Sequence, residues 1–313
     1  MRKPWIVGVL CAAVLVAATA CGDPSSGAGS WPPSGPAHAA PAASASPSSA
    51  PSSRRRAIPS APAERPTVLY LGDSLAMENQ KVLGGLLREE LGAEYTGAPY
   101  SGTTLCDYLD GTGDDSLVPP EDKAAALVRR LRPDVVILQF WGNAWGYTPC
   151  MDGITHDAAR QEYFDRYRAD ARRLTERIAA AAGAVGTDRP KIVWVLQGPD
   201  PITPDRVRRV NAVYEKQAAA SGDLLADAGR AVSPAAARYS WVRYLPCTAS
   251  ERGRPGDCTQ PGRGRTALHR EDDHLHFCLA PTTSTPRPCP VRSPGILRYT
   301  RAIGDAVADH LRN

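Results

Sequence analysis

A serine near the start of the apolar part of the chain has the setting of a nucleophile. The run from Val68 to Leu71 stops at Gly72-Asp73-Ser74 and passes into polar, helix-forming residues, which predicts a buried strand turning sharply into a helix. That geometry puts the Ser74 hydroxyl at the C-terminal edge of a sheet and its backbone N–H at the positive end of a helix. The motif alone fits a helix cap at least as well.

A nucleophilic serine needs a base, and the base needs an orienting group. The stretch from Asp272 to Phe277 lies just ahead of the last predicted helix. Asp273 and His276 are three residues apart, so one turn of loop lets the carboxylate accept from Nδ1–H of the ring. Nε2 would then face Ser74, and His276 would act first as general base and then as general acid.

The same segment also contains the side chains of a possible metal site. The candidate ligands are His269, Asp272, Asp273, His274 and His276. A solvated polar loop would have a similar composition. From this segment alone, catalysis, metal binding and a solvated loop stay equally open.

Two further loops could donate hydrogen bonds to an oxyanion. The apolar run 134–140 leads to Asn143, whose amide N–H could serve this purpose at the end of a strand. A glycine in the loop Tyr100–Thr103 could supply a second donor. Cys106 and Cys150 lie just beyond these two loops. A disulfide between them would fix the loops against each other, although six cysteines allow fifteen pairings.

Strand-like and helical segments alternate from residue 67 onward. Strands are predicted at 67–71, 94–98, 134–140, 191–196 and 223–227. Helices are predicted at 77–91, 121–131, 158–182, 205–220 and 294–311. This alternation indicates one α/β domain with a parallel sheet covered on both faces and a site at the carboxyl ends of the strands. The Gly-, Arg- and Pro-rich segment 247–270 is predicted to be an insertion held by a disulfide.

In order along the predicted domain, the motifs are Ser in Gly-Asp-Ser, then Gly, then Asn, then Asp-x-x-His before the final helix. This order resembles the SGNH (GDSL-type) hydrolase superfamily. The resemblance implies a flavodoxin-like three-layer α/β/α sandwich. It also implies a Ser74, Asp273 and His276 triad, with an oxyanion hole made by the Ser74 N–H, Gly102 and Asn143.

The third block departs from the family pattern, which usually reads Gly-x-Asn-Asp. Here Trp141 stands in the Gly position, Gly142 precedes Asn143, and Ala144 replaces the Asp. The Asn itself is retained. Trp141 and Trp145 are candidate substrate-binding residues that could narrow the pocket or stack on a sugar ring. Packing under the neighbouring loop would explain them equally well.

The N-terminal region has the composition of an export signal followed by a tether. Residues 1–21 combine a basic start with an apolar run too short for a membrane span, ending at Cys21. A lipobox would make Cys21 the acylated residue, although Ala18 stands where Leu is usual. An Ala-x-Ala site would instead leave a free thiol. Residues 22–66 are rich in Ser, Pro and Ala and are predicted to be a disordered tether, with the catalytic domain at 67–313.

Cysteine parity favours the lipoprotein interpretation. Of the eight cysteines, Cys11 lies in the signal segment, and acylation of Cys21 leaves an even set. The six remaining disulfide candidates are Cys106, Cys150, Cys247, Cys258, Cys278 and Cys289. An even set in an exported chain indicates three disulfides.

The resemblance and the predicted export together give a functional hypothesis. We expect an envelope-facing serine esterase that cleaves short-chain O-acyl esters of carbohydrate or glycolipid, without a cofactor or resident metal. Two alternatives stay open: an O-acyltransferase with the same triad, and a catalytically silent glycan-binding module. The net charge of +4 is spread along the chain, so we expect no nucleic-acid partner. We further expect a monomer anchored to the membrane by lipid on Cys21, or else secreted.

Overall fold

The structure is a computed structural model that describes residues 65–112, 116–143, 148–281, 283 and 285–312. The predicted signal peptide with Cys21, residues 22–64 of the predicted tether, Ala144 and Trp145 lie outside these residues.

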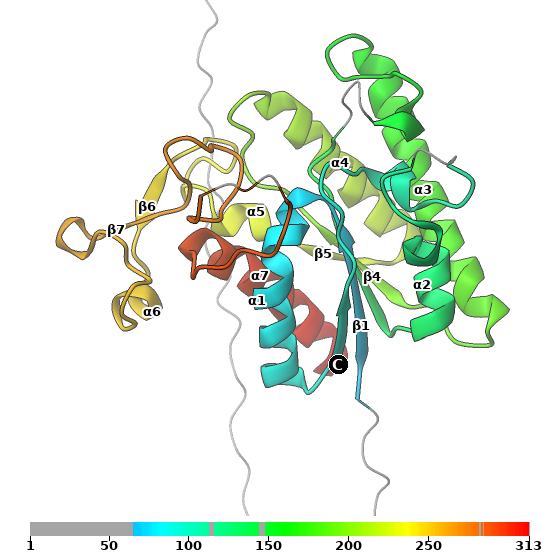
Figure 1. Cartoon of the computed structure of the whole chain (residues 1–313), viewed down its shortest axis with the longest axis horizontal. Coiled ribbons are helices and arrows are strands. Elements are labelled where there is room, and N and C mark those ends of the chain that lie inside the picture. Colours follow the sequence, from blue (N-terminus) through cyan, green and yellow to red (C-terminus); the bar gives the residue numbers. More distant parts are fainter. Residues whose placement is uncertain (1–64, 113–115, 144–147, 282, 284, 313) are drawn as a thin grey trace, which may run out of the picture. The chain divides into compact units, whose positions relative to one another are not determined.

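A sheet of five parallel strands forms the centre of the described fold (Figure 1). The strands are β1 (Thr67–Gly72), β2 (Glu94–Gly97), β3 (Val135–Gln139), β4 (Lys191–Val195) and β5 (Leu224–Ala226). Their spatial order, β2-β1-β3-β4-β5, is that of flavodoxin-like doubly wound sheets. The predicted fold class is therefore confirmed, and each predicted strand boundary is correct to within one residue.

Helices cover both faces of this sheet (Figure 1). The helices on one face are α1 (Ser74–Leu91), the short α5 (Ala228–Ala231) and α7 (Pro294–Arg312). Those on the other face are α2 (Ala124–Leu131), α3 (Arg160–Ala184) and α4 (Pro204–Ser221). Side chains of the strands alternate between the two layers, so that Val68 and Tyr70 of β1 face α1 and α7, and Leu69 and Leu71 face the other layer.

One predicted helix is interrupted. The segment 121–131 begins with a 3₁₀ turn, η2 (Pro120–Asp122), and α2 starts only at Ala124. Lys123 between them has extended backbone, with ψ of 147°. Its buried Nζ donates to the backbone oxygen of Asp107 and to the Thr112 hydroxyl. These hydrogen bonds satisfy the buried ammonium group at the point where the helix is interrupted.

The insertion lies between β5 and α7. It contains the antiparallel pair β6 (Tyr244–Pro246) and β7 (Arg265–Ala267), with α6 (Ala249–Arg252) and η4 (Pro261–Arg263) between them. The predicted disulfide in this segment is present as Cys247–Cys258. None of the helices among the described residues has the length and hydrophobicity needed to cross a bilayer.

Candidate active site

The turn from β1 to α1 is built around a close approach that only glycine permits. A Cβ atom on Gly72 would lie 2.2 Å from the backbone oxygen of Gln139 in β3 and 2.5 Å from the Cβ of Ala76 in α1. Gly72 therefore lets β1 pair tightly with β3 and enter the helix at once. The Ser74 side chain consequently stands at the carboxyl edge of the sheet, on the first residue of α1.

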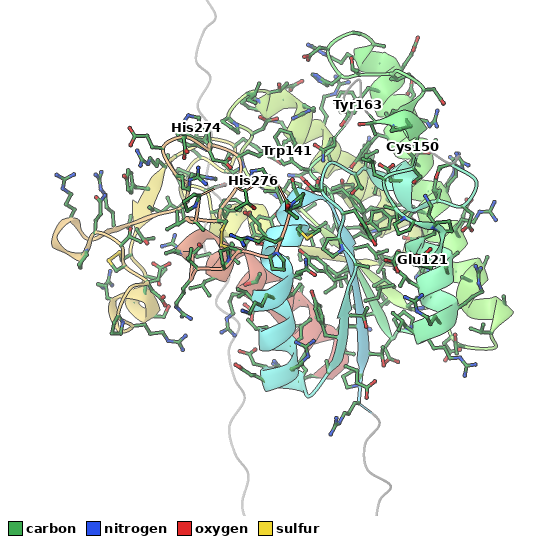
Figure 2. All side chains as sticks on the ribbon, in the orientation of Figure 1. Glu121, Trp141, Cys150, Tyr163, His274 and His276 are labelled. Atoms are coloured by element: carbon green, nitrogen blue, oxygen red, sulfur yellow. A yellow bond between two sulfur atoms is a disulfide. The ribbon has the colours of Figure 1, made fainter. Side chains whose placement is uncertain are left out.

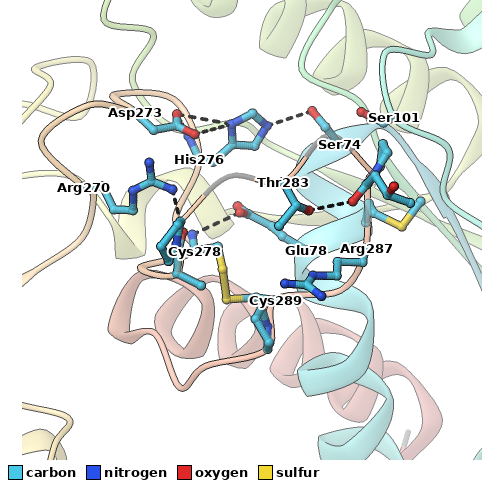
Figure 3. Close-up of a pocket in the computed structure, with 16 residues that line it drawn as sticks. Ser74, Glu78, Ser101, Arg270, Asp273, His276, Cys278, Thr283, Arg287 and Cys289 are labelled. Carbon is cyan, nitrogen blue, oxygen red and sulfur yellow. Dashed lines mark hydrogen bonds and ion pairs between the residues drawn. A yellow bond between two sulfur atoms is a disulfide. The ribbon is translucent and has the colours of Figure 1, made fainter.

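Ser74, His276 and Asp273 form a continuous chain of contacts (Figure 3). Nε2 of His276 lies 3.1 Å from Oγ of Ser74. On the other side of the ring, Nδ1 lies 3.0 Å from Oδ2 and 3.2 Å from Oδ1 of Asp273. Oδ1 of Asp273 also accepts from the backbone N–H groups of His276 and Leu275. Ser74 and His276 are 202 positions apart in the sequence, and they meet because the loop before α7 passes over the carboxyl edge of the sheet.

Asp73 ties the ends of two neighbouring strands together. Its fully buried carboxylate caps α1 by accepting from Leu75 N–H at 3.0 Å. Its other oxygen accepts from the backbone N–H of Trp141 at 2.6 Å, just after β3. The capping role suspected for this motif is therefore filled by Asp73, which leaves the Ser74 hydroxyl facing His276.

The two predicted oxyanion loops lie against each other. Nδ2 of Asn143 donates to the backbone oxygen of Thr103 at 3.0 Å and lies 3.4 Å from Oδ2 of Asp73. Gly102 next to Thr103 has φ of 79°, a left-handed conformation that favours glycine. The disulfide Cys106–Cys150 closes beyond both loops, as the sequence suggested.

The structure places Trp141 in the core. The residue is 2 % exposed, and the guanidinium of Arg206 lies over its ring at 4.0 Å from the ring centroid. Figure 2 labels Trp141 among the side chains of the fold. Packing under a neighbouring element, one of the two alternatives for this residue, is what the structure shows. Its ring is therefore not presented to a substrate, and Trp145 lies outside the described residues.

Burial and neighbouring charge shift the protonation of the site. Burial alone lowers the pKa of His276, but the hydrogen bond to Asp273 and the charges of Glu78, Asp273 and Asp73 raise it to about 8. Burial raises the pKa of Asp273, but the hydrogen bonds and charge of His276 outweigh it and hold this pKa well below its usual range. Burial raises the pKa of Asp73 to about 6, although the hydrogen bonds from the backbone of Trp141 and Leu75 act to lower it.

A pocket of about 150 Å³ opens beside the triad (Figure 3). Its lining comes from the first turns of α1, from Ser101 and from the loop that precedes α7. The lining residues are Ser74, Met77, Glu78, Ser101, Arg270, Asp273, His276, Cys278, Ala280, Pro281, Thr283, Thr285, Pro286, Arg287, Cys289 and Pro290. The disulfide Cys278–Cys289 pins the two ends of this last loop together.

Glu78 is a site residue that the sequence reasoning missed. It is 5 % exposed, lines the pocket, and accepts from the backbone N–H groups of Phe277 and Cys278. Its spacing was the available signal, because a residue four positions after Ser74 lies on the same helical face. His269 was considered only as a metal ligand. Its Nδ1 lies 3.0 Å from the backbone oxygen of His276, which makes it a support for the loop.

The side chains considered as metal ligands have other contacts. Asp272 pairs with Arg270 on the surface, and His274 packs edge-on against Trp241. Within the described ranges, no group of three or more His, Cys, Asp or Glu side chains is arranged to hold a metal ion.

Comparison with known proteins finds similarity at the level of structure alone. No established family model matches the sequence. No curated protein sequence matches it either. A provisionally assigned acylhydrolase from Bacteroides fragilis is similar over 80 % of this chain and 92 % of its own, with 15 % identity and a TM-score of 0.45.

Two further solved structures are similar over most of their length. A family 3 carbohydrate esterase from Clostridium thermocellum matches 80 % of this chain and 98 % of its own, with 12 % identity and a TM-score of 0.42. A lipase from a goat rumen metagenome matches 77 % of this chain and 97 % of its own, with 12 % identity and a TM-score of 0.43. Similarity this distant does not identify a substrate, so the chemistry must be argued from the site itself. In its strand order and in the residues joined at the end of β1, this chain resembles the SGNH hydrolases in structure as it does in sequence.

Proposed function

We propose that this protein is an exported serine esterase that cleaves short-chain O-acyl esters, acetyl esters above all, of cell-envelope carbohydrate or glycolipid. The observation that carries the proposal is the contact chain Ser74–His276–Asp273 at the mouth of a pocket. A hydroxyl, an imidazole and a carboxylate in this order constitute an activated nucleophile.

The reaction proceeds through an acyl-enzyme. Nε2 of His276 takes the proton of the Ser74 hydroxyl as Oγ attacks the ester carbonyl, and Asp273 stabilises the imidazolium that forms. The tetrahedral oxyanion accepts from the N–H groups of Ser74 and Gly102 and from the amide of Asn143. Without substrate, that amide donates to the backbone oxygen of Thr103 at 3.0 Å and lies 3.4 Å from Oδ2 of Asp73. The alcohol leaves with the proton from His276. Water then attacks the acyl carbon with His276 again as base, which frees Ser74 and the acid.

The size of the pocket supports a short acyl group. A volume of about 150 Å³ is similar to that of a cavity that holds one benzene molecule. The Cys278–Cys289 disulfide and residues of the loop that it closes line the same pocket as the triad. We therefore expect p-nitrophenyl acetate to be cleaved roughly tenfold or more faster, by kcat/KM, than the octanoate. Equal or faster cleavage of the octanoate would contradict the short-chain assignment.

The envelope setting rests on the cysteines and the N-terminal sequence. Three disulfides are formed, Cys106–Cys150, Cys247–Cys258 and Cys278–Cys289, which fits an oxidising compartment. We further propose that Cys21 carries the lipid that holds the protein at the membrane. Mass spectrometry of the N-terminal peptide from membranes tests this, since a free Cys21 thiol would contradict it.

The serine mechanism is tested with the full-length chain and its Ser74→Ala variant, both folded under oxidising conditions. Release from p-nitrophenyl acetate, and then of acetate from acetylated envelope polysaccharide, should fall in the variant to the rate of the uncatalysed reaction. Adding free sugar hydroxyls to the same assay separates hydrolysis from acyl transfer.

His274 supplies a matched control for the base. It lies two residues from His276 but is exposed and packs against Trp241. His276→Ala should therefore remove activity, whereas His274→Ala should keep it.

A folded wild type no more active than Ser74→Ala would overturn the esterase proposal in favour of a glycan-binding module.

A further inference from the structure

Glu78 holds the backbone that carries the catalytic histidine. Its Oε1 accepts from the N–H of Phe277 at 2.9 Å, and its Oε2 accepts from the N–H of Cys278 at 3.0 Å. Both donors come directly after His276 in the chain. One buried carboxylate thus uses both of its oxygens to fix the two peptide groups that follow the proposed base.

The same residue also fixes the far end of the pocket wall. The backbone oxygen of Glu78 accepts from the N–H of Cys289 at 3.2 Å. Cys278 and Cys289 are the two ends of the disulfide-closed loop that lines the pocket. Both ends of this loop are therefore attached to a single position of α1, one helical turn after Ser74.

We propose that Glu78 is a positioning residue for the esterase reaction, an inference that rests on the proposed function. Glu78 binds the His276–Cys278 backbone to the helix that carries Ser74, and it thereby sets the distance between His276 and Ser74. Ser74 and Glu78 share one helix and therefore move together. The segment attached to Glu78 consequently keeps its distance from the Ser74 hydroxyl.

The opposite side of the His276 segment is held separately. Nδ1 of His269 contacts the backbone oxygen of His276 at 3.0 Å, and the His269 ring packs at a tilt against Phe277 with 4.7 Å between centroids. Asp273 accepts from the His276 N–H. Glu78 thus attaches the backbone of this segment to α1, whereas His269 and Asp273 belong to the segment's own loop.

The carboxylate form is what this role requires. A glutamine at position 78 has one acceptor oxygen and one NH₂ group, so one of the two backbone N–H groups would face another donor. That donor would be buried and unsatisfied, and the segment would shift to relieve it. Glu78 also faces His276 together with Asp73 and Asp273, and its charge is one of those that raise the pKa of the ring. Burial raises the pKa of Glu78 itself to about 7, against the charge of His276 and the hydrogen bonds from Phe277 and Cys278. Glu78 is therefore ionised in the pH range around 8 in which the ring loses its proton.

The test compares Glu78→Gln with wild type in the full-length chain. We expect kcat on p-nitrophenyl acetate to fall about 10- to 100-fold with KM changed less than about threefold, because misplacing a base by a fraction of an ångström costs rate rather than binding. The pKa of His276, followed by NMR and assigned with His276→Ala, should fall at the same time. Unchanged kcat, or an unchanged pKa of His276, would overturn the proposal.

Glu251 provides the matched control. It is also 5 % exposed and also accepts a backbone N–H, that of Thr248 at 2.8 Å, but it belongs to the insertion and pairs with Arg298. Glu251→Gln should leave kcat and the His276 titration unchanged. Equal losses in both variants would mean that Glu78 acts only through general stability, against the proposal.

Two further outcomes remain decisive. If Glu78→Gln does not fold, Glu78→Asp takes its place: the shorter side chain keeps the charge but not the reach, so kcat should fall while the pKa of His276 stays near its wild-type value. Wild-type kcat in Glu78→Asp would refute the positioning role. If wild type shows no Ser74-dependent turnover, the esterase proposal fails, and the NMR titration still decides whether Glu78 controls the His276 ring.

Discussion

At the residue scale, His276 is surrounded by carboxylates that raise its basicity. Asp273 contacts Nδ1, while Asp73 and Glu78 act on the ring from the start of α1. Burial alone would have lowered the pKa of this ring, but the carboxylates outweigh it, and the pKa is about 8. An unperturbed histidine has a pKa of about 6.5.

This shift predicts an alkaline activity profile. Protonated His276 cannot accept the Ser74 proton, so kcat/KM should fall about tenfold per pH unit below the pKa of the ring and level off above it. The profile of kcat/KM for p-nitrophenyl acetate, measured from pH 5.5 to 9.5, should therefore have its midpoint near pH 8. A midpoint near 6.5 would mean that the carboxylates of α1 do not act on the ring, and a flat profile would argue against His276 as base.

At the element scale, strands, helices and short-range contacts could be predicted from the sequence because their patterns are local. The strand Val135–Gln139 is apolar up to Leu138 and is buried over its whole length. The alternation of such runs with helical patterns predicted the layers. Asp273 and His276 are separated by a short loop, so their contact could be predicted from spacing. The contact with Ser74 followed from the rule that parallel strands present their carboxyl ends at one edge.

The supports of the site could not be predicted in this way. The carboxylate of Glu78 meets Phe277 from 199 residues away, and Asp73 meets Trp141 from 68 residues away. Neither contact leaves a periodic or local pattern in the sequence. Each depends on where the loop before α7 and the end of β3 pack against the start of α1. The burial of Trp141 under Arg206 has the same origin. The sequence could offer two equal alternatives for this residue but no means of deciding between them.

At the scale of the whole molecule, the disulfides make a large contribution to stability. Cys106–Cys150 closes a loop of 44 residues, and the other two bridges each close a loop of 11. Loop entropy in the unfolded chain gives about 4 kcal/mol for the first and about 3 kcal/mol for each of the others. Their joint contribution is similar to the whole stability of an ordinary domain, about 5–15 kcal/mol. A chain that depends on these bridges fits an oxidising compartment.

We expect the disulfides to contribute differently to the free energy of unfolding and to kcat. Replacing Cys106 and Cys150 by Ala should lower the free energy of unfolding in urea by about 4 kcal/mol at most, and replacing Cys247 and Cys258 by about 3 kcal/mol. Only the first pair joins the loops of Gly102 and Asn143, so only its loss should also reduce kcat at temperatures where both variants are folded. Urea unfolding and p-nitrophenyl acetate turnover of the two double variants test this directly. Equal kcat in both would show that the 106–150 bridge stabilises the fold without ordering the proposed oxyanion loops.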